Sequence, residues 1–140
     1  MIPLLAAGAE SDGRPKDKQK GNTVELKQET LEEIFRVTQQ VDRGDITLTK
    51  GRDDLVRAWG LNANSANMTI RSLRHLLNGE RYRRALTLDA TDYFLRRIRD
   101  EYGNQGLQKA LAGLSAHIDY RHSTGVAVPG LQVILSKHRN

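Results

Sequence analysis

Arginines are concentrated in one stretch of this chain, and arginine is the side chain best suited to holding phosphate. Between Arg71 and Arg99 the sequence has eight arginines against three acidic residues, a balance of +5 that equals the net charge of the whole protein. A planar guanidinium can donate two parallel hydrogen bonds to a phosphate group or to the edge of a guanine. The stretch therefore predicts an anionic partner, and nucleic acid is the first candidate.

Within and before this stretch, two kinds of residue are expected to contact nucleic acid. Arginines would hold phosphates or guanine edges, and asparagines near the start of a predicted helix would read adenine. Tyr82, inside the basic turn of residues 79–84, has two interpretations: it stacks on a base, or it anchors the turn in the core while its arginine neighbours stay solvated. The predicted binding set is Asn64, Asn67, Arg71, Arg74, Arg81, Tyr82, Arg83 and Arg84.

Catalytic and metal-binding patterns are weaker. His117 and His122 are five residues apart, so one helix face cannot present both to a metal with Asp119. Glu25 and Lys27 form a Glu-x-Lys pair of the kind that nucleases use to hold a metal, but they lie in a predicted helix and not on a strand. The sequence has no cysteine, glycine-rich phosphate loop or nucleophile elbow. It predicts no enzyme activity, no metal and no cofactor.

Length and composition predict one folded domain with an unpacked end. The 140 residues suffice for a single modest core, and 38% of them are hydrophobic, below the globular average of about 45–50%. Residues 8–22 contain almost nothing apolar, which predicts a disordered basic tail over residues 1–22 and one helical domain over residues 23–140. The absence of cysteine and of a membrane-spanning apolar run favours a cytoplasmic protein.

Apolar residues recur at helical spacing along most of the chain, with glycines between the segments. The pattern predicts an all-α fold, a compact domain of five or six helices. The residues predicted to face inward include Leu26, Leu31, Ile34, Phe35, Thr38 and Val41 in the first helix, Leu77 in the helix that ends at Gly79, and Leu88 and Tyr102 in the helix that ends at Gly103. The expected elements are helices over 24–42 and 53–59 with a connector over 45–51 between them, a helix capped by Asn64 or Ser65, and one capped by Thr87 or Asp89 that runs to Tyr102. A further helix follows from Gln105, and residues 131–137 form a short helix or a strand.

The segment from Asp53 to Asn78 has the outline of a helix-turn-helix. A short helix ends at Gly60, and a longer helix follows a tight turn. Aligning Gly60 with the glycine of that motif places Thr69, and not Ile70, where a buried aliphatic residue is expected. DNA recognition and ordinary helical packing both fit this outline.

Four groups of residues resemble a known domain: Ser65–Asn67, the run from Leu76 to Arg84, Ala90–Leu95 with Tyr102 and Gly103, and Ala110–Leu111 with His117–Tyr120. Their order is similar to that of a small helical domain of bacterial proteins, often found ahead of a nuclease module of the HNH type in restriction-like systems. The resemblance implies a targeting or accessory role near DNA. Because the sequence has no His-Asn-His segment, it predicts double-stranded DNA binding without cleavage. The alternative is an interaction module that docks onto a nuclease or helicase partner, for which exposed tyrosines or Trp59 would serve as anchors.

Overall fold

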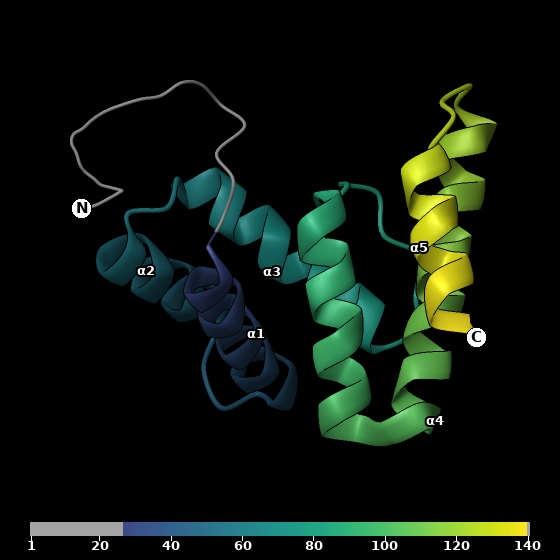
Figure 1. The fold of residues 1–140 in the computed structure, drawn as a ribbon. Helices are drawn as coiled ribbons and strands as arrows, with labels where there is room; N and C mark the ends of the chain where they lie inside the picture. Colours follow the sequence, from purple (N-terminus) through teal and green to yellow (C-terminus); the bar gives the residue numbers. More distant parts are fainter. Residues whose placement is uncertain (1–26, 140) are drawn as a thin grey trace. The chain divides into compact units, whose positions relative to one another are not determined.

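The computed structural model describes residues 27–139, and these residues form helices and no strands. The helices are, in chain order, α1 (Gln28–Arg43), α2 (Leu48–Trp59), α3 (Ala63–Leu77), α4 (Leu88–Ser123) and α5 (Pro129–Arg139) (Figure 1). The predicted all-α fold is confirmed. The tail predicted over residues 1–22 lies outside the described residues.

The chain divides into two compact units, and the division falls within α3, after Ile70. Among the described residues, unit 1 comprises 27–70, with α1, α2 and the first part of α3. Unit 2 comprises 71–139, with the rest of α3, α4 and α5. The single helical domain over residues 23–140 stays a prediction.

In unit 1, α1 and α2 pack closely at a glycine. A Cβ atom placed on Gly51 of α2 would lie only 2.8 Å from Val37 Cγ1 of α1, so no larger residue fits at this contact. The apolar face predicted for the first helix is confirmed, because its members within the described residues are all buried: Leu31, Ile34, Phe35, Thr38 and Val41.

The predicted connector over residues 45–51 is too long, because α2 begins at Leu48 and not at Asp53. The helix starts earlier because the Thr47 hydroxyl accepts a hydrogen bond from the backbone N–H of Lys50 at 3.0 Å. This N-cap satisfies an N–H group that the first helical turn leaves unpaired.

The cap of α3 was also predicted at the wrong residue. Asn62 Oδ1 accepts from the Ser65 backbone N–H at 3.0 Å, so the cap is Asn62 and neither Asn64 nor Ser65. Further along α3, Ile70 is fully buried and Thr69 is partly exposed. The buried aliphatic position thus lies one residue beyond the place that the helix-turn-helix pattern requires, as the sequence indicated.

In unit 2, α4 consists of two arms joined at Gly103, which adopts φ 73° and ψ −170° inside the helix. The first arm, residues 88–102, and the second arm, residues 104–123, run in opposite directions (Figure 1). The two helices predicted on either side of Gly103 are these arms. Thr87 caps the first arm as expected, accepting from the Ala90 N–H at 3.1 Å.

Residues 131–137, which the sequence predicted as a short helix or a strand, belong to helix α5, and α5 packs against α4. Asp92 of α4 accepts hydrogen bonds from His138 Nε2 at 2.7 Å and from Lys137 Nζ at 3.0 Å, both on α5. Burial opposes ionisation of Asp92, but these two bonds and the lysine charge outweigh it and hold the pKa of the carboxyl below its usual value. The ionised carboxylate fastens the end of α5 to α4.

Three side chains predicted to be inward are more exposed than expected. Leu88 is 50% exposed and Tyr102 is 47% exposed, although both were placed in the apolar stripe of the first arm. In α3, Leu76 is fully buried while the predicted Leu77 is only partly buried. Leu88 is the first residue of α4, where its side chain lies against Gly130 of α5, and Tyr102 is the residue before the kink at Gly103.

Candidate nucleic-acid interface

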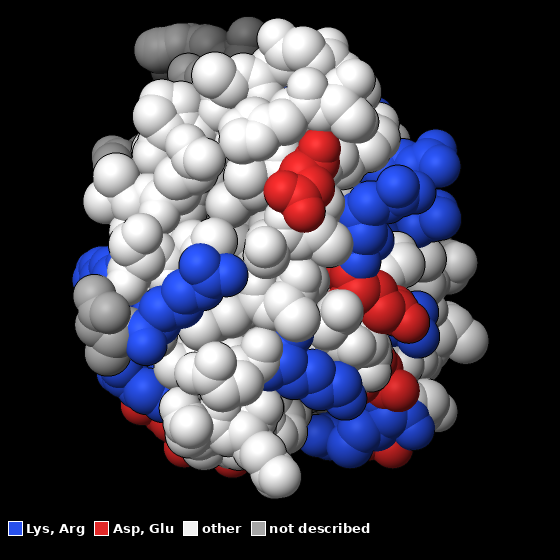
Figure 2. All heavy atoms as spheres, turned by 90° about the vertical axis from the view of Figure 1, so that its right-hand side faces the viewer, with Lys and Arg blue, Asp and Glu red and all other residues white. Residues whose placement is uncertain are grey.

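Among the described residues, unit 2 carries a net positive charge and unit 1 does not. Residues 71–139 contain twelve Lys and Arg against six Asp and Glu, whereas residues 27–70 contain six against seven. Figure 2 shows the side of the molecule on which α5 lies, and basic side chains occupy more of this face than acidic ones. An anionic partner would therefore be attracted to unit 2.

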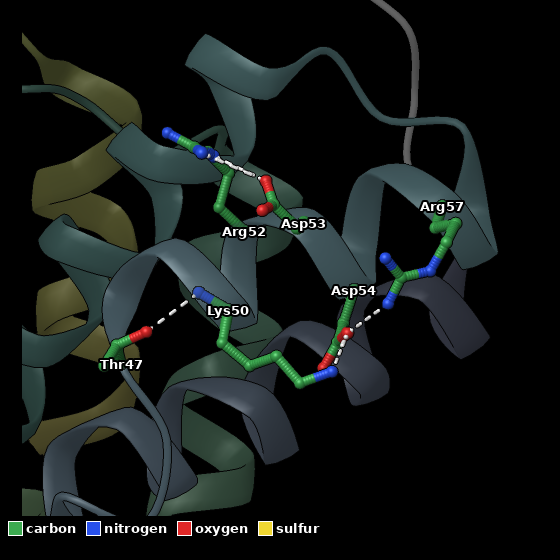
Figure 3. Close-up of polar contacts among 6 residues, drawn as sticks. All are labelled: Thr47, Lys50, Arg52, Asp53, Asp54 and Arg57. Atoms are coloured by element: carbon green, nitrogen blue, oxygen red, sulfur yellow. Dashed lines mark hydrogen bonds and ion pairs between the residues drawn. The ribbon is translucent and has the colours of Figure 1, made fainter.

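The basic side chains of unit 1 are largely paired with acids. On α2, Asp54 contacts Lys50 Nζ at 2.8 Å and Arg57 Nη2 at 2.6 Å, and Arg52 contacts Asp53 at 3.0 Å (Figure 3). The hydrogen bond from Lys50 is the largest influence on the pKa of Asp54 and lowers it. Burial opposes this, and the charges of Lys50 and Arg57 add to the lowering. The outer face of α2 is thus nearly neutralised.

Unit 2 itself contains two groups of arginines. The three arginines of the first arm of α4 each lie near a carboxylate, with Arg96 near Asp92, Arg97 near Glu101 and Arg99 near Asp100, at N···O distances of 3.5, 3.4 and 3.8 Å. By contrast, the exposed Arg81, Arg83 and Arg84 have no ion-pair partner within residues 27–139. Surface ion pairs are weak, but a neighbouring carboxylate repels phosphate, so the second group is the better phosphate site.

These three arginines belong to the connection between α3 and α4, residues 78–87, here called the arginine loop. Its second residue, Gly79, has a φ of 70°, the left-handed conformation that glycine adopts without strain and that follows the end of α3. The N–H of Glu80 then donates to the His75 carbonyl at 2.8 Å, and the Glu80 carboxylate contacts His75 Nδ1 at 3.0 Å. The one acidic side chain of the loop is therefore engaged with α3.

Two close backbone approaches press the arginine loop against the second arm of α4. A Cβ atom on Gly79 would lie 2.9 Å from the Lys109 carbonyl oxygen, and one on Gly113 would lie 3.0 Å from the Glu80 carbonyl oxygen. Side chains at either glycine would hold the backbones apart. The loop is also tied to α3, because the Ser72 hydroxyl donates to the Arg84 carbonyl at 2.7 Å.

Tyr82 anchors the middle of the loop. Its side chain is buried, and its ring stacks on His117 of α4 with 4.1 Å between ring centroids and an angle of 6° between the planes. His117 is fully buried, and its Nδ1 lies 2.6 Å from the Tyr82 carbonyl oxygen. Since a carbonyl can only accept, Nδ1 carries the proton of this hydrogen bond.

The anchor is uncharged. Burial lowers the pKa of His117, the hydrogen bond to the Tyr82 carbonyl opposes this, and the positive charge of Arg121 lowers the pKa further. Burial also raises the pKa of the Tyr82 hydroxyl. A neutral imidazole therefore lies against a neutral phenol, and the stacked pair forms the uncharged contact that holds the loop on α4.

On either side of Tyr82, the two flanking arginines reach one aromatic ring. The guanidinium carbon of Arg81 lies 5.2 Å from the centroid of the Tyr120 ring, and that of Arg83 lies 6.0 Å from it. Both distances are within the range of a cation–π interaction. Tyr120 comes about one helical turn after His117 on α4. Neighbouring turns of that helix therefore contact Tyr82, through His117, and the two arginines, through Tyr120.

The predicted binding residues are thus placed as follows. Arg81 and Arg83 come together over Tyr120, and the backbone of Arg84 lies beside Ser72, next in sequence to the exposed Arg71. Arg74 is partly buried near the end of α3. Asn64, exposed, and Asn67, partly buried, belong to unit 1, so the site is built from unit 2 alone.

Tyr82 is a correction to the predicted set. With 1% of its surface exposed and its ring against His117, it cannot stack on a base, and the alternative interpretation as a core anchor is the correct one. Tyr120, Ser72 and Gly113 belong to the candidate site but are not among the residues predicted from the sequence. The three-residue spacing between His117 and Tyr120 is a signal that the two rings share a helix face.

The histidines considered as metal ligands can be placed in the structure. His117 is a buried packing residue, and residues 27–139 contain no group of three or more His, Asp or Glu side chains placed to hold a metal. Glu25 of the Glu-x-Lys pair lies outside the described residues. No helix among residues 27–139 is long and apolar enough to cross a membrane.

Comparison with protein-family models, curated proteins and solved structures found no match for this chain. The resemblance to a nuclease-associated helical domain therefore stays a prediction. Any function assigned to the chain has to be argued from the site itself.

Proposed function

We propose that this protein binds double-stranded DNA through the arginine loop of unit 2, without cleaving it. The observation that carries the proposal is the presence of three exposed arginines, without carboxylate partners among residues 27–139, on a loop that is fixed at both ends and in the middle. Fixing the backbone lowers the entropy lost when the side chains are ordered by a ligand. The loop therefore suits a polyanion with regularly placed phosphates.

The aromatic side chains favour a duplex over a single strand. Proteins that bind single strands stack the bases on exposed aromatic rings. In the arginine loop, Tyr82 is enclosed against His117, and the nearby Tyr120 has two guanidinium groups over its ring. Little aromatic surface is left for unpaired bases, whereas the phosphates on the outside of a duplex are directly accessible to the arginines.

The test is a fluorescence anisotropy titration of the full chain against three ligands at low and near-physiological salt. The ligands are a random-sequence duplex of about 20 base pairs, a single strand of the same length, and a heparin fragment of similar length. The proposal expects the duplex to bind most tightly and with a steep dependence on salt. Equal or tighter binding of heparin would reduce the site to a general anion patch, and absence of duplex binding at low salt would refute the proposal.

A further inference from the structure

Tyr120 stands at the centre of the two best-placed arginines, although it belongs to a different element. It is partly exposed on the second arm of α4, and the chain reaches it thirty-seven residues after Arg83. The contacts at 5.2 Å and 6.0 Å place both guanidinium carbons within reach of one ring. Two like charges that would repel each other in solution are thereby held over a single negative π surface.

The arrangement follows from the way in which the loop is anchored. Tyr82 points inward to His117, while its neighbours Arg81 and Arg83 are exposed. Because His117 and Tyr120 are three residues apart on one helix, the ring that receives Tyr82 and the ring that receives the arginines lie side by side. The position of the arginines is therefore determined by α4 as well as by the loop.

We infer that Tyr120 is a positioning residue of this site, which orders Arg81 and Arg83 so that their N–H edges meet phosphate oxygens of the DNA backbone. This inference rests on the proposed function. The donors of a guanidinium lie in its plane, so a guanidinium that turns its face to the ring keeps them available for bidentate bonds to phosphate. A lysine at either position keeps the charge but has neither a planar face nor a fork, so the site is selective for arginine.

Three variants separate positioning from charge. Tyr120→Ala leaves every arginine in place, so the salt dependence of duplex binding keeps its slope while the affinity falls about five- to thirtyfold, the loss expected for two exposed cation–π contacts. Tyr120→Phe keeps the ring and restores the affinity. The double variant Arg81→Ala/Arg83→Ala reduces the slope as well, because it removes charges.

A double-mutant cycle tests the selectivity for arginine. Replacing Arg81 and Arg83 together by Lys weakens duplex binding in the wild-type background and has a smaller effect in the Tyr120→Ala background, because the ring contact is already lost there and only the loss of the guanidinium fork remains. Additive losses would overturn the inference. If Tyr120→Ala proves unstable by circular dichroism, Tyr120→Leu, which preserves more of the packing, takes its place in the cycle.

One further measurement separates the positioning role from the proposed function. In the free protein, NMR of the arginine side chains should show ring-current shifts for Arg81 and Arg83 that disappear in Tyr120→Ala. If Tyr120→Ala binds duplex as tightly as the wild-type protein does, Tyr120 does not position the arginines, and the proposed function is unaffected. Wild-type protein that binds no duplex refutes the proposed function, and the ring-current shifts then show separately whether Tyr120 orders Arg81 and Arg83 in the free protein.

Discussion

Replacing Tyr82 by Ala is the perturbation that follows most directly from the structure of the arginine loop. The side chain is 1% exposed, and its ring lies flat on that of His117. Removing it leaves a cavity between the loop and α4 and breaks the stack. The hydrogen bond from His117 to the Tyr82 carbonyl remains chemically possible, because it involves only the backbone of residue 82.

The expected loss is large. Truncation of a fully buried aromatic side chain to Ala costs about 3–5 kcal/mol, a figure that includes the cavity. A stacked aromatic pair adds about 0.5–1.5 kcal/mol beyond the burial of area. We therefore expect Tyr82→Ala to lower the free energy of unfolding by about 4 kcal/mol, a large share of the stability of a small protein.

The matched control is Tyr82→Phe. The Tyr82 hydroxyl has no hydrogen-bond partner within residues 27–139, so its removal should change the free energy of unfolding by less than about 1 kcal/mol. Urea unfolding followed by circular dichroism measures both variants. A loss below about 1 kcal/mol for Tyr82→Ala, or equal losses for the two variants, would refute the role of the ring as the anchor of the loop.

Three further changes have defined outcomes. Gly113→Ala should lower the melting temperature, by the equivalent of about 1–3 kcal/mol, because its Cβ would lie 3.0 Å from the Glu80 carbonyl oxygen; an unchanged or raised melting temperature would contradict the close approach. Thr87→Ala should cost about 1 kcal/mol in urea unfolding through loss of the N-cap of α4, and no loss would mean that the cap contributes nothing. The pKa of Asp92 is lowered in the folded state, so ionised Asp92 stabilises the fold above pH 3.8, and this stabilisation is lost as the pH falls through the folded-state pKa. Asp92→Asn should flatten this part of the curve of unfolding free energy against pH. An unchanged curve would mean that Asp92 does not stabilise the α4–α5 contact.

The helical class could be predicted from the sequence because apolar periodicity and glycines carry local information. The face of α1 and the break at Gly103 both follow from residues that are neighbours along the chain. The start of α2 was not predicted, because Gly51 looks like part of a connector in the sequence. In the structure it is a helical residue that lies too close to Val37 of α1 for any side chain, and this contact between helices cannot be read from neighbouring residues.

The candidate site could likewise be predicted only where the information is local in the sequence. The arginines were found because their type and density are visible in the sequence. Which tyrosine is buried and which one contacts them was not visible, because Tyr82 and Tyr120 both lie beside basic residues. The choice is made by His117, which is thirty-five residues from Tyr82 in sequence and stacks on it in space. Contacts over such separations depend on the packing of the loop against α4.

Two variants of equal charge test whether the arginine loop, and not the general positive charge of unit 2, binds duplex DNA. One is Arg81→Ala/Arg83→Ala, which removes arginines that have no carboxylate partner in the described part of the chain, and the other is Arg97→Ala/Arg99→Ala, which removes arginines that lie near Glu101 and Asp100. The measurement is the slope of the logarithm of the duplex association constant against the logarithm of salt concentration.

Each lost phosphate contact lowers the magnitude of that slope by about 0.9. If the arginine loop holds the phosphates, the slope decreases by about two units for Arg81→Ala/Arg83→Ala and by almost nothing for Arg97→Ala/Arg99→Ala. Equal decreases for the two variants would show that the loop has no special role in binding duplex DNA.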